Sequence, residues 1–396
     1  MTVSRFVRSP GSLGARPLVR VASVCALAAA IAGCNATANS FNAISDRAEI
    51  VGNKMGSYFS KQPGVAQQVP LFIASTRHQA GDAPGEVVAR FSLQNVSLPP
   101  DHRAGEIEAP SFGSPNPDKH FVVTARRSLD PDAFRAELAS HISGRIGNSR
   151  DVLLYVHGFN TSLEEARFRL AQIVADGGFT GVPILFTWNS KGELFAYESD
   201  KEAATASRDA LQRLMMDIAQ APGVGRVQIL AHSMGSWLTM EALRETAIAG
   251  HADLDGKLGS VMLAAPDIDL GVFRQQVARL DPSRISVFVS RDDRALSLSS
   301  RIAGSRARLG AMDPSNPKDA AAIDAMGVRV YDLSMLKQGW VGHDTYANAP
   351  DAVRQIGATL TKKRDSDANV QAVIGASVAP PPQAPIVGQD LPPPAK

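Results

Sequence analysis

The chain has 396 residues, 44% of them hydrophobic and 20% charged, a composition typical of one large or two medium globular domains. The formal net charge is +2 and becomes −2 if the four arginines of the first 33 residues are removed with a signal peptide, since 37 basic residues then face 39 acidic ones. This balance excludes a strongly basic surface, so no nucleic-acid partner is expected.

The first 33 residues have the features of a secretory signal peptide, because arginines precede an apolar stretch at residues 21–31 that is too short to span a bilayer. The end of this stretch, Ile-Ala-Gly-Cys34, resembles the lipobox of bacterial lipoproteins, in which the cysteine is lipidated and becomes the new N-terminus. A chance cysteine after an ordinary secretory signal is the alternative. The resemblance implies a bacterial envelope protein anchored to a membrane by its lipid, and Asn35 in place of Asp implies the periplasmic side of the outer membrane.

The two cysteines of the chain are Cys25, within the signal peptide, and Cys34, which would carry the lipid. No thiol then remains for a disulfide, a metal or nucleophilic chemistry. Residues 34–68 are polar and rich in small residues, and we expect them to form a tether. Residues 362–396 contain runs of three prolines and are expected to form an extended, disordered tail, with a docking segment for a partner as the alternative.

The domain expected between these segments, residues 69–361, begins with three strand-like runs that have no long helix between them, which suggests antiparallel strands. Six short apolar runs follow, and helical patterns such as 163–176 and 203–219 fill every gap between them but the last. The runs are 69–74, 87–93 and 121–125, then 152–156, 183–188, 227–231, 260–264, 285–290 and 328–333. Apolar strands alternating with helices indicate an α/β fold with a mostly parallel, twisted sheet covered on both faces.

The strongest functional motif lies at residues 226–240, where a β-branched apolar run is followed by Ala-His-Ser-Met-Gly and then by a helical pattern. A small-x-Ser-x-Gly turn between a strand and a helix is typical of a nucleophile elbow, which would hold the hydroxyl of Ser233 out of the sheet. The same pattern surrounds Ser111, but the prolines that follow exclude a helix, so a loop is expected there. Neighbouring residues at a strand end point to opposite sides, which predicts that His232 lies beneath the elbow and faces away from Ser233.

A serine nucleophile needs a base that takes its proton and an acid that orients the base. In α/β hydrolases these residues follow the serine in the order Asp or Glu, then His, each after a strand. Of the two histidines after Ser233, His251 ends the elbow helix and is expected at the surface. His343 follows the last strand in a glycine-rich loop, and we expect it to be the base; a structural loop histidine is the alternative.

Two strand ends offer an acid. Asp267 and Asp269 follow the first of them, and Asp292 and Asp293 follow the second, which is the usual site in this fold. The sequence Ser-Arg-Asp-Asp-Arg-Ala-Leu at residues 290–296 resembles the pattern around the acid in α/β hydrolases, and that resemblance selects Asp293. Asp292 remains the alternative.

A developing oxyanion needs fixed backbone donors, usually one after the nucleophile and one from the loop after an earlier strand. His157 and Gly158 resemble the His-Gly pair of many lipases and esterases, which assigns the amides of Phe159 and Met234 to the oxyanion hole. A plain β-turn at the end of the strand is the alternative.

Three aromatic residues follow the next strand, and we consider Trp188, Phe195 and Tyr197 as walls of an acyl or alcohol pocket, with packing in the core as the alternative. The stretch 77–82 and the loop around His102 are further functional candidates, and a structural capping role explains each of them equally well.

Taken together, these motifs resemble a family of uncharacterised bacterial α/β-hydrolases described only as esterase-like or lipase-like. The segments that carry the resemblance are 72–77, 96–105, 157–160, 186–200, 231–235 and 290–296. It covers roughly residues 68–360 and implies the α/β-hydrolase fold, with Ser233 after the third parallel strand. One departure is Asn189, where relatives commonly have proline, which could reshape the loop at the pocket.

The resemblance implies a lipid-anchored serine hydrolase that cleaves an ester or related acyl bond and needs no metal or organic cofactor. Two alternatives remain open. One is an envelope binding or scaffold lipoprotein that keeps the fold without turnover, and the other is a thioesterase, amidase or acyltransferase that uses the same triad.

Overall fold

The computed structural model describes residues 64–361 apart from residues 84, 194–195, 303, 305 and 337–342. The predicted signal peptide, Cys34, the tether up to residue 63, Phe195 and the C-terminal tail lie outside the described residues. The chain divides after Leu360, and the segment from Thr361 to Lys396 is a separate unit. Within the described part, no helix is long and apolar enough to cross a membrane.

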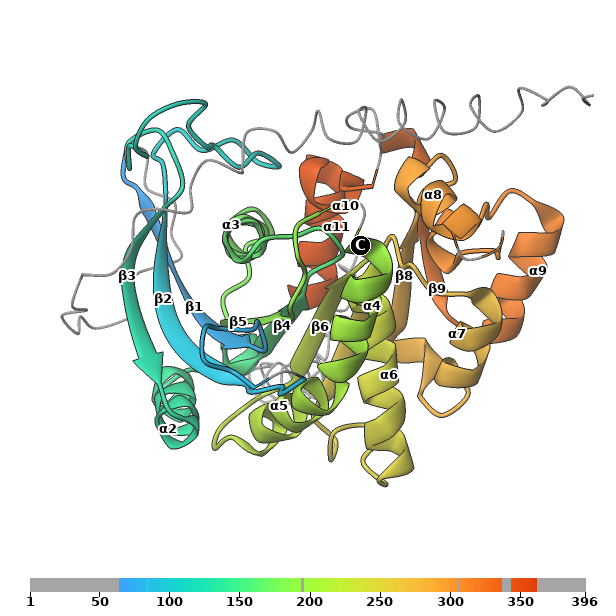
Figure 1. Cartoon of the computed structure of the whole chain (residues 1–396), viewed down its shortest axis with the longest axis horizontal. Helices are drawn as coiled ribbons and strands as arrows, with labels where there is room; N and C mark the ends of the chain where they lie inside the picture. The colour runs from blue at the N-terminus through green and yellow to red at the C-terminus, as the bar shows by residue number, and fades with distance from the viewer. Residues whose placement is uncertain are drawn as a thin grey trace, which may run out of the picture. The chain divides into compact units, whose positions relative to one another are not determined.

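A nine-stranded sheet runs through the described part in the order β3-β2-β1-β5-β4-β6-β7-β8-β9 (Figure 1). The first three strands, β1 (Gln67–Ser75), β2 (Arg90–Leu98) and β3 (Val122–Leu129), pair antiparallel as expected. Strand β1 then joins β5 in parallel. The second strand begins later than the apolar run at 87–93 indicates, because its register pairs Arg90 with Ser75 at the end of β1.

The remaining strands are all parallel, and those from β4 to β8 are almost entirely buried. They are β4 (Val152–Val156), β5 (Val182–Thr187), β6 (Val227–His232), β7 (Leu258–Ala264), β8 (Ile285–Val289) and β9 (Arg329–Asp332). Burial on both faces explains their continuous apolar runs. The predicted α/β-hydrolase sheet with antiparallel N-terminal strands is therefore confirmed.

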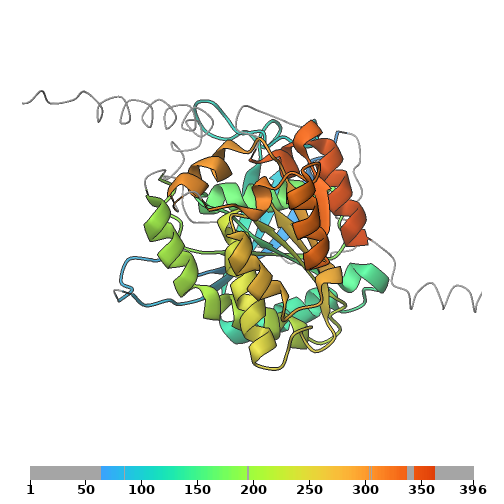
Figure 2. The same cartoon turned by 90° about the vertical axis from the view of Figure 1, so that its right-hand side faces the viewer.

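Helices cover both faces of this sheet, as Figures 1 and 2 show. One apolar core contains buried side chains of α2 (Pro131–Ile142), α5 (Arg208–Gln220), α6 (Met234–Ile248), α7 (Leu270–Val277) and α9 (Pro317–Met326). The second core, on the opposite face, contains those of α3 (Leu163–Asp176), α10 (Thr345–Asn348) and α11 (Pro350–Thr361). Helices α4 (Tyr197–Ala206) and α8 (Arg294–Ile302) lie in the loops beyond the carboxyl ends of β5 and β8.

Two helix predictions are corrected. The helix expected at 203–219 is two helices, because the chain breaks at Ser207, whose buried hydroxyl bonds to the Ala203 carbonyl and to the Thr76 hydroxyl. The last gap between strands, where no clear helical pattern was expected, contains α8 and α9. Helix α9 is a short alanine-rich segment that starts at a proline, so its apolar face is too weak to stand out in the sequence.

Candidate active site

The turn between β6 and α6 places Ser233 in a strained backbone conformation, with φ of 52° and ψ of −120°. Such a conformation is rare for a residue with a side chain and persists only where the surroundings enforce it. The Ser233 N–H donates to the Ala264 carbonyl of the neighbouring strand at 2.9 Å, and the Ser233 carbonyl accepts from the N–H of Asp267 at 3.2 Å. A Cβ atom on Gly235 would lie 2.2 Å from the His157 carbonyl oxygen, so only glycine fits there.

A carboxylate and an imidazole meet beyond the end of β8. The Nδ1–H of His343 donates to Oδ2 of Asp293 at 2.6 Å, and the Leu296 N–H donates to Oδ1 of the same carboxylate at 2.9 Å. Asp293 is completely buried, whereas Asp292 is exposed. Burial opposes the charged imidazole, but the Asp293 carboxylate outweighs burial and raises the pKa of His343 to about 9. Of the two candidate acids on this loop, the geometry therefore joins Asp293 to the base.

The ring of His232, the residue before Ser233, packs against the ring of His343. The pair of Asp293 and His343 therefore lies next to the elbow. The His232 ring is buried, and its centroid lies 4.7 Å from that of His343 and 4.6 Å from that of Tyr346. That the His232 ring faces away from the Ser233 hydroxyl stays a prediction, and its contact with the His343 ring was not expected from strand alternation. Burial and the charge of His343 lower the pKa of His232 to about 3, so its ring is neutral.

The Ser233 hydroxyl and the His343 ring thus lie at the same end of the sheet, on segments far apart in the sequence. Within residues 64–361 as described, no hydrogen bond joins the two groups. Such catalytic hydrogen bonds are often long without substrate and shorten when it binds.

The loop after β4 lies directly against the elbow. A Cβ atom on Gly158 would be 3.0 Å from the Ser233 Cβ and 2.8 Å from Nδ1 of His232, so the loop can approach this closely only with glycine at this position. The next residue, Phe159, is one of the two predicted oxyanion donors. The other, Met234, occupies the first position of α6, where a backbone N–H has no acceptor within the helix and the helix dipole favours negative charge. Both amides therefore belong to segments that border the nucleophile.

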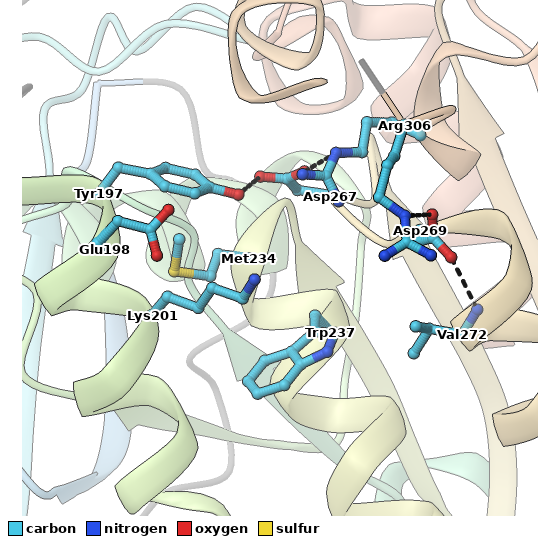
Figure 3. A pocket seen from close by; sticks show the side chains of 10 residues that line it. Tyr197, Glu198, Lys201, Met234, Trp237, Asp267, Asp269, Val272 and Arg306 are labelled. Atoms are coloured by element: carbon cyan, nitrogen blue, oxygen red, sulfur yellow. Dashed lines mark hydrogen bonds and ion pairs between the residues drawn. The ribbon is translucent and has the colours of Figure 1, made fainter. Parts of the chain in front are cut away.

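A cavity of about 300 Å³ opens beside the elbow (Figure 3). The Phe159 ring packs edge-on against the ring of Tyr197, a lining residue, with centroids 5.4 Å apart. The lining residues are Tyr197, Glu198, Lys201, Met234, Trp237, Asp267, Asp269, Val272, Arg306 and Arg308. Tyr197 lines this cavity, and its predicted role in an acyl or alcohol pocket stays a prediction.

The two other candidate acids, Asp267 and Asp269, line this cavity, and their carboxylates bind groups other than His343. Asp267 accepts from the hydroxyls of Tyr197 at 2.8 Å and Ser299 at 2.7 Å and pairs with Nε of Arg308 at 3.1 Å. Burial, together with the Asp267 charge, raises the pKa of Tyr197, so its hydroxyl stays a donor. Asp267 is therefore part of the wall and of the elbow's support.

Asp269 has a structural position at the start of α7. Its side chain accepts from the Val272 N–H at 3.1 Å and pairs with Nε of Arg306 at 2.9 Å (Figure 3). Asp269 caps the helix and pairs with Arg306, so its carboxylate is engaged there and does not bind His343.

The model of a family described as "Alpha/beta hydrolase of unknown function (DUF900)" matches residues 130–364, more than half of the chain. The chain belongs to this α/β-hydrolase family. The match includes the elbow, Asp293 and His343, and the family agrees with the resemblance predicted from the motifs. No curated protein matches the sequence.

Solved structures similar to this α/β hydrolase include several esterases. Brefeldin A esterase, a bacterial homologue of human hormone-sensitive lipase, is 12% identical, with a TM-score of 0.36 over 89% of this chain and 88% of that one. An esterase of Pyrobaculum calidifontis is 16% identical, with a TM-score of 0.34 over 55% and 77%. An esterase of Rhizomucor miehei is 11% identical, with a TM-score of 0.33 over 77% and 85%. These likenesses concern the fold alone.

The expected place of Trp188 in a substrate pocket is not what the hydrolase shows. Trp188 is fully buried, stacks on His157 with centroids 5.1 Å apart, and donates from its indole N–H to the His157 carbonyl at 3.0 Å. Burial, with the charge of Arg77, lowers the pKa of His157 well below its usual value, so this ring is neutral. Both rings therefore support the loop after β4 from the core, where an aromatic at a strand end packs most easily.

The sequence left Arg77 open between a functional and a structural role, and the structure shows a half-buried side chain that supports neighbouring segments. Its guanidinium donates to the Thr187 hydroxyl at 2.7 Å and to the carbonyls of Ser190 at 2.8 Å and Thr161 at 2.6 Å. Burial lowers its pKa to about 10, which leaves it charged at neutral pH. Arg77 therefore joins the end of β1 to the loop after β5 and to the loop after β4.

His102 also has a structural role, because it joins its loop to α3. The sequence of the loop does not show which residues are its partners. The ring lies between two carboxylates, with Nδ1 2.8 Å from Glu108 and Nε2 3.0 Å from Asp176 of α3. Burial opposes the charge, but the two carboxylates outweigh it and raise the pKa of His102 to about 9. Elsewhere, Ser111 is exposed in a loop and His251 pairs with Asp255 at the surface. Across the described residues, no three His, Cys, Asp or Glu side chains form a group that could hold a metal ion.

Proposed function

We propose that the protein is a serine hydrolase that cleaves a carboxylic ester or related acyl bond through an acyl-enzyme. The observation that carries the proposal is the 2.6 Å contact between the buried Asp293 carboxylate and His343, beside the strained turn at Ser233. A serine, a base and an acid in this order and at this end of the sheet are the parts that acyl transfer requires.

In the proposed reaction the Ser233 oxygen attacks the carbonyl carbon while His343 takes the hydroxyl proton at Nε2. Asp293 holds the ring through Nδ1–H and stabilises the imidazolium. The amides of Phe159 and Met234 donate to the oxyanion. The tetrahedral intermediate collapses, and His343 gives its proton to the departing alcohol. Water then attacks the acyl-enzyme with the same base, which releases the acid and free Ser233.

Labelling with a fluorophosphonate probe tests this proposal. The wild type should bind the probe covalently at Ser233, and Ser233→Ala should abolish labelling and ester hydrolysis while the thermal unfolding curve stays the same. The matched control is Ser111→Ala, which removes the other serine in a small-x-Ser-x-Gly pattern and should leave labelling unchanged. A wild type that is folded but neither labelled nor active on any acyl substrate would support a binding or scaffold protein instead.

The chemical class of the bond is the next point to measure. The same triad serves thioesterases, amidases and acyltransferases, because all of them form an acyl-enzyme. Parallel assays with an ester, a thioester and an amide of the same acyl group would rank these activities. We propose that the ester is the best of the three.

We also propose that the mature protein is anchored to the periplasmic face of the outer membrane by a lipid on Cys34. The support for this is the sequence Ile-Ala-Gly-Cys34 after a short apolar stretch. Metabolic labelling with an alkyne fatty acid should tag the wild type and not Cys34→Ser, and only the wild type should sediment with outer-membrane vesicles. An unlabelled wild type would contradict the anchor and leave the hydrolase proposal untouched.

A further inference from the structure

The cavity beside Met234 contains carboxylates whose oxygens already have partners. Both oxygens of Asp267 and both oxygens of Asp269 face a donor within the protein. These two side chains therefore have little capacity left to bind donors of a substrate. They make the wall stable and fix the cations that share it.

The cationic side chains of the same wall keep unused donors. An arginine carries five N–H groups, and the described residues engage Arg308 at Nε and Nη2 and Arg306 at Nε. Lys201 accepts a hydrogen bond from the Thr205 hydroxyl at its backbone carbonyl, but its ammonium group has neither a hydrogen bond nor an ion pair with any residue that the structure describes. Arg308 is nearly buried, so its guanidinium is a fixed feature of the cavity. The wall thus offers more donors than acceptors.

Glu198 is the lining carboxylate that remains as an acceptor. It lies one helical turn before Lys201 on α4, so the two opposite charges are close along the helix although no ion pair joins them in the described part of the chain. One carboxylate does not offset the donors that Arg306 and Arg308 leave unused.

The cavity also has the right location for the substrate. Met234, whose amide is a proposed oxyanion donor, forms part of its wall, and Tyr197, another lining residue, contacts the ring of Phe159. A carbonyl held between these two amides would place one end of the substrate in the cavity. We propose that the cavity binds a short part of the substrate that carries oxygen acceptors, foremost a carboxylate. This inference rests on the proposed function and names its substrate class.

A long aliphatic chain fits these walls poorly. The volume of about 300 Å³ is at the small end for ligand pockets, and the apolar lining consists of Met234, Trp237 and Val272. A fatty acyl chain would cover charged groups without replacing their bonds to water, which costs free energy. A carboxylate in the same position would accept charge-assisted hydrogen bonds from them.

Matched esters test the proposal. On the acyl side, monoethyl succinate is compared with ethyl butanoate and ethyl decanoate; on the alcohol side, carboxymethyl butanoate is compared with propyl butanoate. Acid release is followed by pH-stat titration. We expect kcat/KM to be about tenfold higher for the carboxylate member of at least one pair, because a charge-assisted hydrogen bond contributes on that scale, and lowest for decanoate.

Two variants locate the effect. Lys201→Gln and Arg306→Gln should each reduce the ratio of kcat/KM for the carboxylate ester to kcat/KM for its uncharged partner at least threefold. Arg301→Gln is the matched control, since Arg301 is an exposed arginine on α8 that does not line the cavity. It should leave the preference unchanged.

A binding measurement separates failure of this inference from failure of the proposed function. Succinate should raise the Tm of the Ser233→Ala protein more than butanoate does, and Lys201→Gln in the same background should remove the difference. A higher kcat/KM for ethyl decanoate than for monoethyl succinate, or no carboxylate preference in either pair and no Tm difference, would overturn the inference. A wild type that the probe does not label, with the succinate effect retained, would instead overturn the proposed function and leave the anion site standing.

Discussion

The two sides of the proposed catalytic centre, the nucleophile side at Ser233 and the base side at His343, are held by different kinds of contact. On the nucleophile side, Ser233 is fixed by main-chain hydrogen bonds to Ala264 and Asp267 and by the close approach of Gly235 to the His157 carbonyl. Few side chains are needed there. The strained turn is specified by the backbone and by glycines.

On the base side, side chains from distant elements hold α10, which follows His343. Arg169 of α3 donates to the Asn348 side chain at 2.8 Å, and Gln172 donates to the Ala347 carbonyl at 3.1 Å. Gln172 also donates to Asp176, which binds His102. The comparison teaches that the nucleophile is locally encoded, whereas the base depends on packing between segments far apart in the sequence.

The largest expected effect comes from breaking the base side at its acid. Asp293→Asn should lower kcat by about 10⁴-fold, since the amide cannot stabilise the imidazolium and favours the wrong tautomer. Rates with an ethyl ester before and after the substitution measure it. Asp292→Asn, which changes the exposed neighbour, should stay within about threefold of wild type. Equal losses in the two variants would show that Asp293 is not the acid.

Breaking the nucleophile side requires a backbone change. Gly235→Ala would put a Cβ atom 2.2 Å from the His157 carbonyl and 2.7 Å from that of Val156. Because both neighbours are backbone atoms of a central strand region, we expect the free energy of unfolding to fall by about 3 kcal/mol and probe labelling to be lost. Urea unfolding followed by circular dichroism measures the first effect. A variant as stable and as reactive as wild type would contradict the close contact.

The sequence predicted the fold well for reasons that the sheet makes clear. Strands buried on both faces appear in the sequence as continuous apolar runs. The start of a helix such as α3 is marked by a capping box at Ser162 and Glu165. The elbow could also be predicted, because the residues that specify it, Ser233 and Gly235, lie within one turn of the chain and form a short sequence motif. The α/β-hydrolase family follows from such local patterns.

Contacts between distant segments were less accessible. The order of residues pointed to Asp293 and His343, but nothing in the sequence indicates that the His232 ring packs on His343, since strand alternation does not say what lies across the turn. The same holds for the ion pair of Asp267 with Arg308 in the cavity wall. These partners are set by loop packing, which has no periodic pattern.

The pH dependence of activity sharpens the comparison, because it reports on the base side alone. His343 must be neutral to accept the serine proton, and Asp293 raises its pKa to about 9. We therefore expect kcat/KM to fall about tenfold per pH unit below pH 9 and to level off above it. Rates from pH 6 to 10 test this, with an NMR titration of His343 as an independent measure. A profile that is flat between pH 7 and 10 would contradict the ion pair.

The smallest effect is expected at the far end of the base side, at His102. Its pKa is raised above the ordinary 6.5 to about 9, so the charged ring stabilises the fold fully below about pH 6.5, and this stabilisation is lost as the pH rises through 9. His102→Gln should therefore lower the free energy of unfolding by about 2 kcal/mol at pH 6 and by much less at pH 10. Urea unfolding at both pH values measures the difference, with His251→Gln, at the exposed pair with Asp255, as a control close to zero. A loss of equal size at both pH values would mean that His102 acts by its shape and not by its charge.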